Sequence, residues 1–548
     1  MDNRVIAFLV LSLLVILGYD YMMKELGVVP TSPSEEATVF RSDAPAAPVG
    51  SGSSSSIESK PAVSVAPATG PTATAAAVTE RTVSVETALI RVELSSRGGV
   101  VKGWELKRYS TQVDSGVPVQ LVYKGGQFPG PLSLRLPDAA ATRELLEGVY
   151  QVEQDLTTLD ASHPLGRVVF RYRNAASGLA VEKVLTFHHD SYLVDVAMTV
   201  QGIPGPVDVS LGANFGVVEW GEGFIGLIGP ASLVDDKVDK ATPDAESERS
   251  GAVKWAALQD KYFMSVLIPR QGTSVLVKKE LDKVVSSAVR TALPAGGGSI
   301  DLQLYAGPKE FDTLRAMNLG LEDTIDFGWF IYGSWGIVKM VAKPIFAVLR
   351  TINEATHSYG LSIILLTVGL KLLFAPLQYK SYKSMKDMQL IQPKVQAIQE
   401  KYKDDRDRLN KELIKLYRDH KVNPVGGCLP MLLQMPVFVA LFNVLYMTIE
   451  LRQAPFFLWV KDLSVPDPFY VLPIIMGATM VIQQKITPTT MDPTQAKVML
   501  ILPVMMTFLF LTFPAGLVLY WLTNNTLTIT QQLVTDRYLL KKPVPASP

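Results

Sequence analysis

The chain has 548 residues, of which 48% are hydrophobic and 19% are charged. Its mean hydropathy of +0.21 is high for a soluble protein, while its charged fraction is high for membrane helices alone, so we predict a mixed protein. A single cysteine, Cys428, and only five histidines exclude a disulfide scaffold and argue against Cys-rich or His-rich metal sites. We expect neither a metal nor a cofactor.

The chain opens with an apolar segment, which we predict as a transmembrane anchor over residues 1–24. Its apolar stretch from Val5 to Met23 is 19 residues long, close to the roughly 20 that span a bilayer. A cleaved signal peptide is the alternative, but the following Gly18-Tyr19-Asp20-Tyr21 lacks the small-residue pattern of a cleavage site. Residues 25–79 are rich in Pro, Ala, Ser and Thr and predict a disordered linker.

The largest polar block, residues 80–326, predicts one large antiparallel β-sandwich. Residues alternate between apolar and polar in runs such as Val181–Phe187 and Val194–Val200, and glycine and proline separate these runs. Residues 327–358 then combine Trp and Lys or Arg with apolar side chains, which is typical of an amphipathic helix in the membrane interface. A helix packed on the sandwich is the alternative for this segment.

Five apolar segments in the remainder of the chain predict further membrane spans, which give six with the anchor. Their predicted bounds are 359–377, 428–449, 469–484, 498–513 and 515–535. The intervening segments are a basic helical hairpin at 378–427, an outer loop at 450–468, an inner loop at 485–497 and an inner tail at 536–548.

The distribution of charge predicts the orientation. From Lys24 to Gly328 there are 28 basic and 37 acidic residues, a net charge of −9, whereas Pro376–Gly427 has 12 basic and 7 acidic residues, a net charge of +5. Because cytoplasmic loops carry the excess of Lys and Arg, we expect both termini and the hairpin in the cytoplasm and the β domain outside. A large outer domain without cysteine suits a bacterial periplasm.

Lys371 is the main candidate for a functional residue, because a charged side chain within a span is costly. The alternative is that its ammonium group snorkels to the inner interface. Other polar residues occur in the spans, and we expect them to converge with Lys371 on a hydrated groove, although ordinary interhelical hydrogen bonds would also explain each one. They are Thr367, Gln434, Asn443, Thr523, Asn524, Asn525 and Thr528.

The hairpin at 378–427 carries apolar residues at helical spacing and is rich in Lys and Arg on its other faces. Its basic surface could meet anionic headgroups, ribosomal RNA or an acidic protein, or it could be a solvated inner loop. The chain contains no phosphate-binding GxxxxGK[ST], so we expect no nucleotide-driven motor, and it contains no GxSxG and no HExxH motif. Two function classes stay open at this point: a small-solute transporter and an anchored carbohydrate-processing enzyme.

Six motifs near the C-terminus are distinctive, namely Asn423–Pro430, Gln434-Met435-Pro436, Glu450–Phe456, Asp462-Leu463-Ser464, Leu472-Pro473-Ile474 and Phe513–Trp521. They resemble the YidC/Oxa/Alb membrane protein insertase family. The anchor, the large polar domain and the segment FGWFIYGSWG from Phe327 resemble its Gram-negative YidC form, so the resemblance spans the whole chain, with specific motifs from about Gly328 to Gln532. The resemblance implies an N-terminal anchor, a five-helix insertase core and a large periplasmic β-supersandwich. It also implies a multi-pass protein of the bacterial inner membrane.

The resemblance assigns roles to individual residues. Lys371 takes the place of the family's groove cation, which is usually arginine, and Thr367 and Gln434 match groove positions; we place Asn524 beside them. Met435, Phe438 and Tyr520 match apolar positions that contact substrate helices. The implied activity is insertion and folding of inner-membrane proteins, alone or with the Sec translocon.

The implied partners follow from that activity. They are nascent membrane proteins, the Sec translocon with its accessory subunits, the ribosome and the signal-recognition machinery at the hairpin, and anionic lipids. The groove of the family is open to the cytoplasm and to lipid but closed outward, so we expect the polar residues named above to face such a groove.

Overall fold

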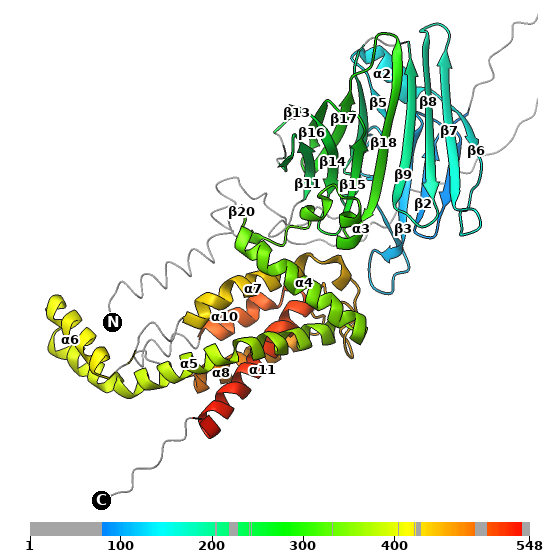
Figure 1. The fold of residues 1–548 in the computed structure, drawn as a ribbon. Coiled ribbons are helices and arrows are strands. Elements are labelled where there is room, and N and C mark those ends of the chain that lie inside the picture. Colours follow the sequence, from blue (N-terminus) through cyan, green and yellow to red (C-terminus); the bar gives the residue numbers. More distant parts are fainter. Residues whose placement is uncertain are drawn as a thin grey trace, which may run out of the picture. The chain divides into compact units, whose positions relative to one another are not determined.

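The computed structural model describes residues 79–202, 205–218, 228–240, 242, 244–330, 333–403, 405–420, 422, 429–487 and 501–539. The described residues lie in one compact unit, Ala75–Pro548. Strands dominate as far as Pro308, and helices follow from Gly336 (Figure 1). The predicted anchor, the predicted linker up to residue 78 and most of the predicted loop at 485–497 lie outside the described residues.

A nine-stranded antiparallel sheet is the broadest layer of the β domain (Figure 1). Period-two alternation builds it, as in β8, where every second side chain is buried. Its strands, in spatial order, are β12 (Lys237–Asp239), β11 (Gly229–Val234), β14 (Val253–Gln259), β15 (Phe263–Pro269), β18 (Gly297–Pro308), β9 (Leu193–Gln201), β8 (Leu179–His188), β7 (Leu165–Asn174) and β6 (Gln151–Gln154).

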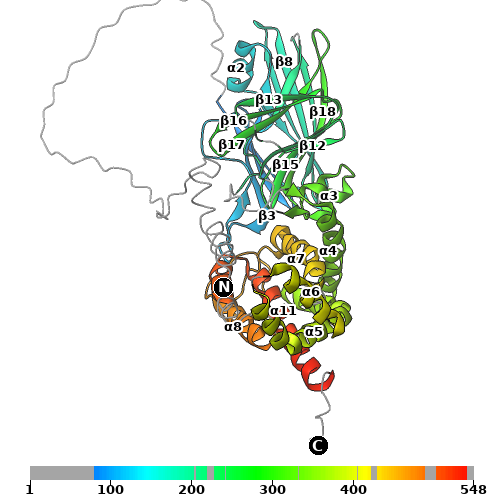
Figure 2. The ribbon, with the colours of Figure 1, turned by 90° about the vertical axis from the view of Figure 1, so that its left-hand side faces the viewer.

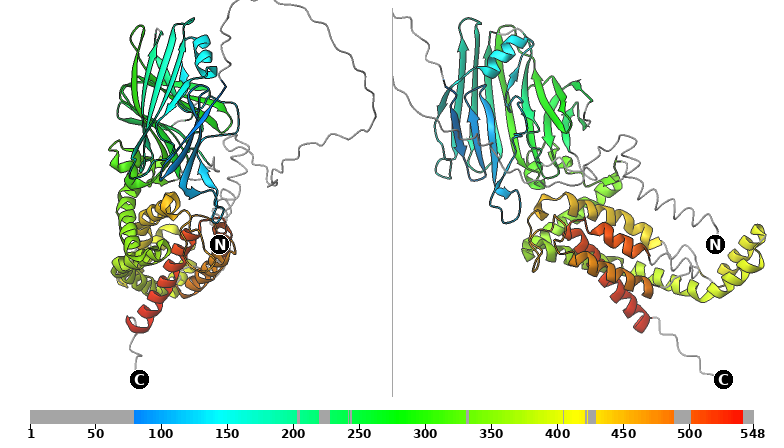
Figure 3. Two further views of the ribbon diagram at one scale, coloured as in Figure 1. Left: turned by 90° about the vertical axis from the view of Figure 1, so that its right-hand side faces the viewer. Right: turned by 180° about the vertical axis from the view of Figure 1, so that it is seen from behind.

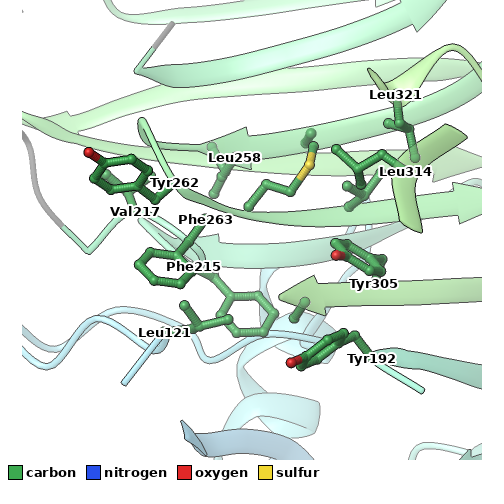
Figure 4. Packing of buried hydrophobic residues seen from close by; sticks show 14 of the residues in the cluster. Leu121, Tyr192, Phe215, Val217, Leu258, Tyr262, Phe263, Tyr305, Leu314 and Leu321 are labelled. Carbon is green, nitrogen blue, oxygen red and sulfur yellow. The ribbon is translucent and has the colours of Figure 1, made fainter. Parts of the chain in front are cut away.

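A five-stranded antiparallel sheet packs against this layer, since β14 contacts β16 and β17 and β10 contacts β15 (Figure 2). Its order is β13 (Glu246–Ser250), β16 (Ser274–Leu281), β17 (Val284–Thr291), β10 (Val207–Ala213) and β5 (Leu134–Arg135). Aromatic and aliphatic side chains fill the core of the domain, and Figure 4 shows Phe215, Phe263 and Tyr305 among them. The predicted domain rich in antiparallel β-sheet is therefore confirmed.

A four-stranded sheet completes the domain and is tied to the others by a buried lysine. Its strands are β1 (Thr82–Glu86), β2 (Ile90–Ser95), β3 (Val100–Ser110) and β4 (Pro118–Gln120). The Lys183 ammonium group of β8 donates to the carbonyl oxygens of Gly98, Gly99 and Leu132 at 2.9, 3.0 and 2.8 Å. Lys183 is fully buried, and this burial lowers its pKa to about 7.

Helices make up the remainder of the described chain. Short helices α2 (Ala139–Glu147), α3 (Phe311–Ala316) and η1 (Leu321–Thr324) belong to the β domain, and the hairpin β19 (Trp329–Phe330) and β20 (Gly333–Ser334) follows. The helices after it are α4 (Gly336–Thr356), α5 (Tyr359–Lys401), α6 (Arg406–Asp419), α7 (Leu429–Met447), η2 (Ile449–Leu451), α8 (Val471–Ile486), α10 (Ile501–Phe510), α11 (Ala515–Val534) and η3 (Thr535–Leu539).

The α5 helix differs from the prediction in its length. It runs for 43 residues without interruption, so the predicted boundary between a span ending at 377 and a hairpin starting at 378 lies inside one helix (Figure 3). Pro376 and Pro393 are tolerated within it. Its second half and α6 enclose a small core of Met388, Ile391 and Val395, against which Leu413, Leu416, Tyr417 and Val422 pack.

Among the described residues, α5 is the one helix that is both long and apolar enough to cross a membrane. Shorter apolar helices occupy Gln434–Met447, Val471–Ile486 and Ile501–Phe510. The six predicted spans therefore stay a prediction. Large apolar side chains nevertheless point outward from these helices, and Leu372 and Leu373 of α5 are 70% and 68% exposed.

Close packing holds the helices together: α11 contacts α5, α7 and α8, while α10 contacts α8. At Gly477 of α8, an added Cβ atom would lie 2.0 Å from the hydroxyl oxygen of Thr507 in α10. Glycine therefore permits the approach of these two helices, as small residues do at interfaces between membrane helices.

The α4 helix joins the β domain to the helices. It buries Val338, Ala342, Ile345, Phe346 and Leu349 on one face and packs on α5 and α7. On its polar side, Lys339 pairs with Asp323 at 2.8 Å and Arg350 donates to Asp312 at 2.7 Å. Its exposed apolar residues, Ile337, Met340 and Val348, and Trp335 at its N-cap match the amphipathic pattern that the sequence predicts for this segment.

Glu450, in η2, lies in an acidic environment beside this junction. Burial raises its pKa to about 7, and the negative charges of Glu310 and Asp312 add to that shift while Arg350 opposes it. Tyr109 donates to Glu310 at 2.6 Å in the same region. The folded protein therefore holds a proton on Glu450 more tightly than the unfolded chain does.

We expect Glu450→Gln to make the protein more stable at neutral pH. The pKa of Glu450 is about 7 in the folded protein and near 4.5 in the unfolded chain. Below pH 4.5 the carboxyl group is protonated in both states and costs the fold nothing. As the pH rises from 4.5 to about 7, the unfolded chain loses the proton first, so the folded protein becomes less stable. The variant and the natural chain should thus melt alike near pH 4.5, and the variant should be more stable by about 3 kcal/mol at pH 8. Thermal melts of the detergent-solubilised protein across this range test it. Glu354→Gln, at an exposed position of α4, should leave the pH profile unchanged.

Candidate functional site

A row of polar side chains on α11 and on η3, which follows it directly, faces the neighbouring helices and forms the candidate site. Asn525, Thr528, Gln532 and Asp536 follow each other at intervals of three, four and four residues, which places them on one side of the helix. The row extends for about 16 Å along the axis, at 1.5 Å per residue. We call it the polar row.

Lys371 of α5 lies at the centre of the polar row. Its ammonium group donates to the hydroxyl oxygen of Thr528 at 2.7 Å, and that hydroxyl donates in turn to the carbonyl oxygen of Asn524 at 2.6 Å. The lysine is partly buried, whereas Leu372 and Leu373 beside it point outward. Thr367, one turn before Lys371, is buried and donates to the carbonyl oxygen of Ile363 at 2.6 Å.

The other members of the polar row also have partners on neighbouring helices. Asn525 donates to Thr479 of α8 at 3.3 Å, and Gln532 donates to Thr487 just after α8 at 3.0 Å. Asp536 accepts a hydrogen bond from Tyr382 at 2.7 Å and pairs with Lys386 at 2.7 Å, both from the second half of α5. The row thus connects α11 to α5 and α8 by polar contacts along its whole length.

Aromatic side chains pack above the polar row, toward the beginning of α11. Phe438 of α7 stacks on Tyr520 with ring centroids 6.3 Å apart and meets Trp521 edge-on at 4.9 Å. Tyr520 is buried, while Met435, one turn before Phe438, is 50% exposed. The structure therefore places Phe438 and Tyr520 together. Met435 lies at an exposed position of α7, the helix that carries Phe438.

The structure does not gather all the polar residues that the sequence singles out. Asn443 was predicted to converge with Lys371, but its amide donates at 2.8 Å to the carbonyl oxygen of Phe327, at the end of the β domain. That prediction is wrong because α7 contacts the segment before α4 at this point. Gln434, Thr523 and Asn524 are partly exposed, and the Thr523 hydroxyl donates to Leu519 within its own helix at 2.8 Å.

Sequence reasoning missed Thr479, Thr487, Gln532, Tyr382, Lys386 and Asp536. The spacing of Asn525, Thr528 and Gln532 at three and four residues could have predicted that they share one side of a helix. The partners of the row lie up to 157 residues away along the chain, and no local pattern marks them. Among the described residues, no group of three or more His, Cys, Asp or Glu is placed to hold a metal ion.

The chemistry of this arrangement suits binding better than bond making. A lysine ammonium group among hydroxyl and amide groups, next to an outward apolar surface, attracts anionic groups where water is scarce. Of the aromatic side chains above it, Phe438 and Trp521 are partly exposed, whereas Tyr520 is buried.

Known proteins show similarity over nearly the whole chain. Residues 82–348 match the YidC periplasmic domain, and residues 351–542 match the family described as 60Kd inner membrane protein. A membrane protein insertase YidC from Geotalea daltonii is 39% identical over 98% of this chain and 100% of its own length, and one from Geobacter metallireducens is 38% identical over 97% and 98%. A crystal structure of an active YidC insertase with its first transmembrane domain resolved shares 21% identity, covers 83% of this chain and 92% of its own, and has a TM-score of 0.36.

Proposed function

The chain belongs to the membrane protein insertase YidC family, and from this premise we propose how its own residues insert a membrane protein. The observation that carries the proposal is the Lys371 ammonium group, held at 2.7 Å from Thr528 between α5 and α11. In this proposal, the polar row and Lys371 line a hydrophilic groove open to the cytoplasm and to lipid.

The groove acts first on the polar part of a client. The ammonium group of Lys371 attracts acidic residues of a short hydrophilic tail or loop and draws this segment partway across the membrane. The hydroxyl group of Thr528 and the amide groups of Gln434 and Asn524, which are partly exposed, offer hydrogen bonds in place of water, while the buried Thr367 hydroxyl stays bonded to Ile363. This lowers the cost of bringing polar atoms into the bilayer.

The apolar part of the client then moves into lipid along Met435 and Phe438, and the buried Tyr520 ring supports Phe438 by stacking on it. Burial of the client helix supplies the driving free energy, at about 25 cal/mol per Å² of apolar surface. No covalent bond is made or broken in this sequence, so the proposed activity is not enzymatic.

The location and partners in this proposal follow from the same premise. The chain lies in the inner membrane of a Gram-negative bacterium with six spans, both termini in the cytoplasm and the β domain in the periplasm. Its hairpin, formed by the second half of α5 and by α6, receives nascent membrane proteins from the ribosome or the signal-recognition machinery and contacts anionic lipids. It acts alone or with the Sec translocon and its accessory subunits.

Depletion of the protein in its host tests the proposed function. The clients are a small single-span protein with an acidic outer tail and a small two-span protein with a short polar outer loop. We expect both to stay accessible to protease only from the cytoplasmic side after depletion, and to regain their outer segments when the full chain is restored. Normal insertion of both clients in depleted cells would contradict the proposal.

A further inference from the structure

The segment between α7 and α8 carries exposed apolar side chains that the proposed insertion mechanism does not use. Phe457 is 66% exposed and Leu458 is 72% exposed, which makes them among the most exposed large apolar residues in the described chain. Phe469 and Tyr470, directly before α8, are 65% and 49% exposed. We call these four residues the apolar rim.

The turn that presents Phe457 and Leu458 is firmly held. The Phe456 amide donates to the Val460 carbonyl at 2.9 Å, and the Val460 amide donates to the Phe457 carbonyl at 3.1 Å. Leu458 has a left-handed backbone with φ of 52°, which a leucine rarely adopts. The turn therefore fixes an unfavourable backbone conformation and directs two large apolar side chains outward.

Neighbouring residues fasten the turn to the helices. The Phe456 ring occupies the space beside Gly360 at the start of α5, where an added Cβ atom would lie 2.0 Å from it. The Trp459 indole donates to Asp467 at 2.9 Å, and the amide of Gly516, at the start of α11, donates to the Leu463 carbonyl at 2.9 Å. The apolar rim thus lies at the level where α5, α8 and α11 begin.

The apolar rim continues the outward apolar surface of these helices. Leu361 and Leu365 of α5 are 42% and 43% exposed, and Ile474 of α8 is 58% exposed. The opposite side of the same segment is polar, since Lys461 pairs with Asp114 of the β domain and Gln453 donates to the Ser110 carbonyl at 2.8 Å. The segment therefore has an apolar side continuous with the helices and a polar side bound to the β domain.

We propose that the apolar rim inserts into the outer leaflet of the membrane and contacts the upper acyl chains of its lipids. This inference rests on the proposed function, which places the helices in a bilayer and the β domain outside it. Aromatic residues with an apolar body favour the membrane interface, and Tyr470 can keep its hydroxyl group among the headgroups. The rim fixes how deeply the outer end of the helices sits, since its turn is joined to α5, α8 and α11.

Site-specific fluorescence in vesicles tests the insertion. In a Cys428→Ser background, the full chain carries an environment-sensitive label at Leu458→Cys and is reconstituted into phosphatidylcholine and phosphatidylglycerol vesicles. Two matched positions serve as references. Leu372→Cys, 70% exposed on α5, reports lipid contact, and Ala176→Cys, in the exposed turn between β7 and β8, reports water. Lipids with a spin label at carbon 5 and aqueous iodide are the two quenchers.

The outcomes separate three environments. We expect the spin-labelled lipid to quench position 458 at least threefold more than position 176, and iodide to quench it at least threefold less. Quenching by iodide as at position 176 would overturn the inference, and so would protection from both quenchers, which would indicate a protein occupant such as a second copy of the chain. Lipid quenching at position 372 should occur in every case. Its failure would count against the proposed function itself, whereas failure at 458 alone concerns only the rim.

Discussion

Lys371→Met is expected to reduce insertion of a client with an acidic outer tail by about tenfold, which corresponds to about 1.4 kcal/mol. Methionine keeps the length and apolar stem of the side chain but removes the charge that attracts the tail. Thr528 keeps its hydrogen bond to Asn524 at 2.6 Å, so we expect the helices to remain folded. The measurement is the fraction of client whose outer tail becomes protease-accessible from the periplasmic side in cells that depend on the variant.

Two controls make this result specific to charge. Lys371→Arg keeps the positive charge and should retain most of the activity, although its planar guanidinium group contacts Thr528 differently. A client whose tail carries Asn and Gln in place of Asp and Glu should be inserted equally well by Lys371→Met and by the natural chain. Equal loss for the charged and the neutral client would show that the lysine supports the fold of the site rather than attracting the tail.

Lys183→Met is expected to destabilise the β domain by about 3 kcal/mol. The substitution leaves the buried carbonyl oxygens of Gly98, Gly99 and Leu132 without their shared donor, and each such loss costs about 1–3 kcal/mol. For a domain of this size the melting midpoint should fall by roughly 6–12 °C. The change is measured by thermal melts of the detergent-solubilised full chain, in which proteolysis of the β domain reports its unfolding.

Lys279→Met is the matched control, because Lys279 is an exposed lysine on β16 of the same domain. It should shift the midpoint by less than about 2 °C. An unchanged midpoint in Lys183→Met would contradict the role of Lys183 as the link between the four-stranded sheet and the larger one.

Period-two patterns such as Val181–Phe187 predicted the β domain well, because alternate side chains of β8 are in fact buried. The arrangement of the strands in three sheets was beyond prediction, since strand order depends on pairings between distant segments, as between Gly297 of β18 and Gln201 of β9. The continuity of α5 across the predicted span boundary at 377/378 was not predicted. The boundary was placed where the polar composition begins, and a change of side-chain polarity does not by itself end a helix, whose hydrogen bonds join backbone groups.

The candidate site was predictable in part. A lysine among apolar residues drew attention to Lys371, and Thr528 stood among the polar residues that the sequence singled out. Which polar residues meet was not predictable: Asn443 faces Phe327, whereas Asn525 meets Thr479. Such pairings depend on how each helix is rotated about its axis, and apolar helices with little amphipathic pattern leave that rotation unmarked in the sequence.

The uninterrupted α5 helix places its C-terminal end far from Pro376. From Pro376 to Lys401 it extends for about 37 Å, so a turn of ten degrees about the proline would move its far end by roughly 6 Å. Asp536 contacts this part of α5 through Tyr382 and Lys386, which lie closer to Pro376 than to Lys401. A partner that binds at the tip of the hairpin therefore acts farther from Pro376 than the contacts with Asp536 do. A bend at Pro376 that moves the tip would thus displace Tyr382 and Lys386 less, together with their contacts to Asp536, which lies eight residues after Thr528, the partner of Lys371.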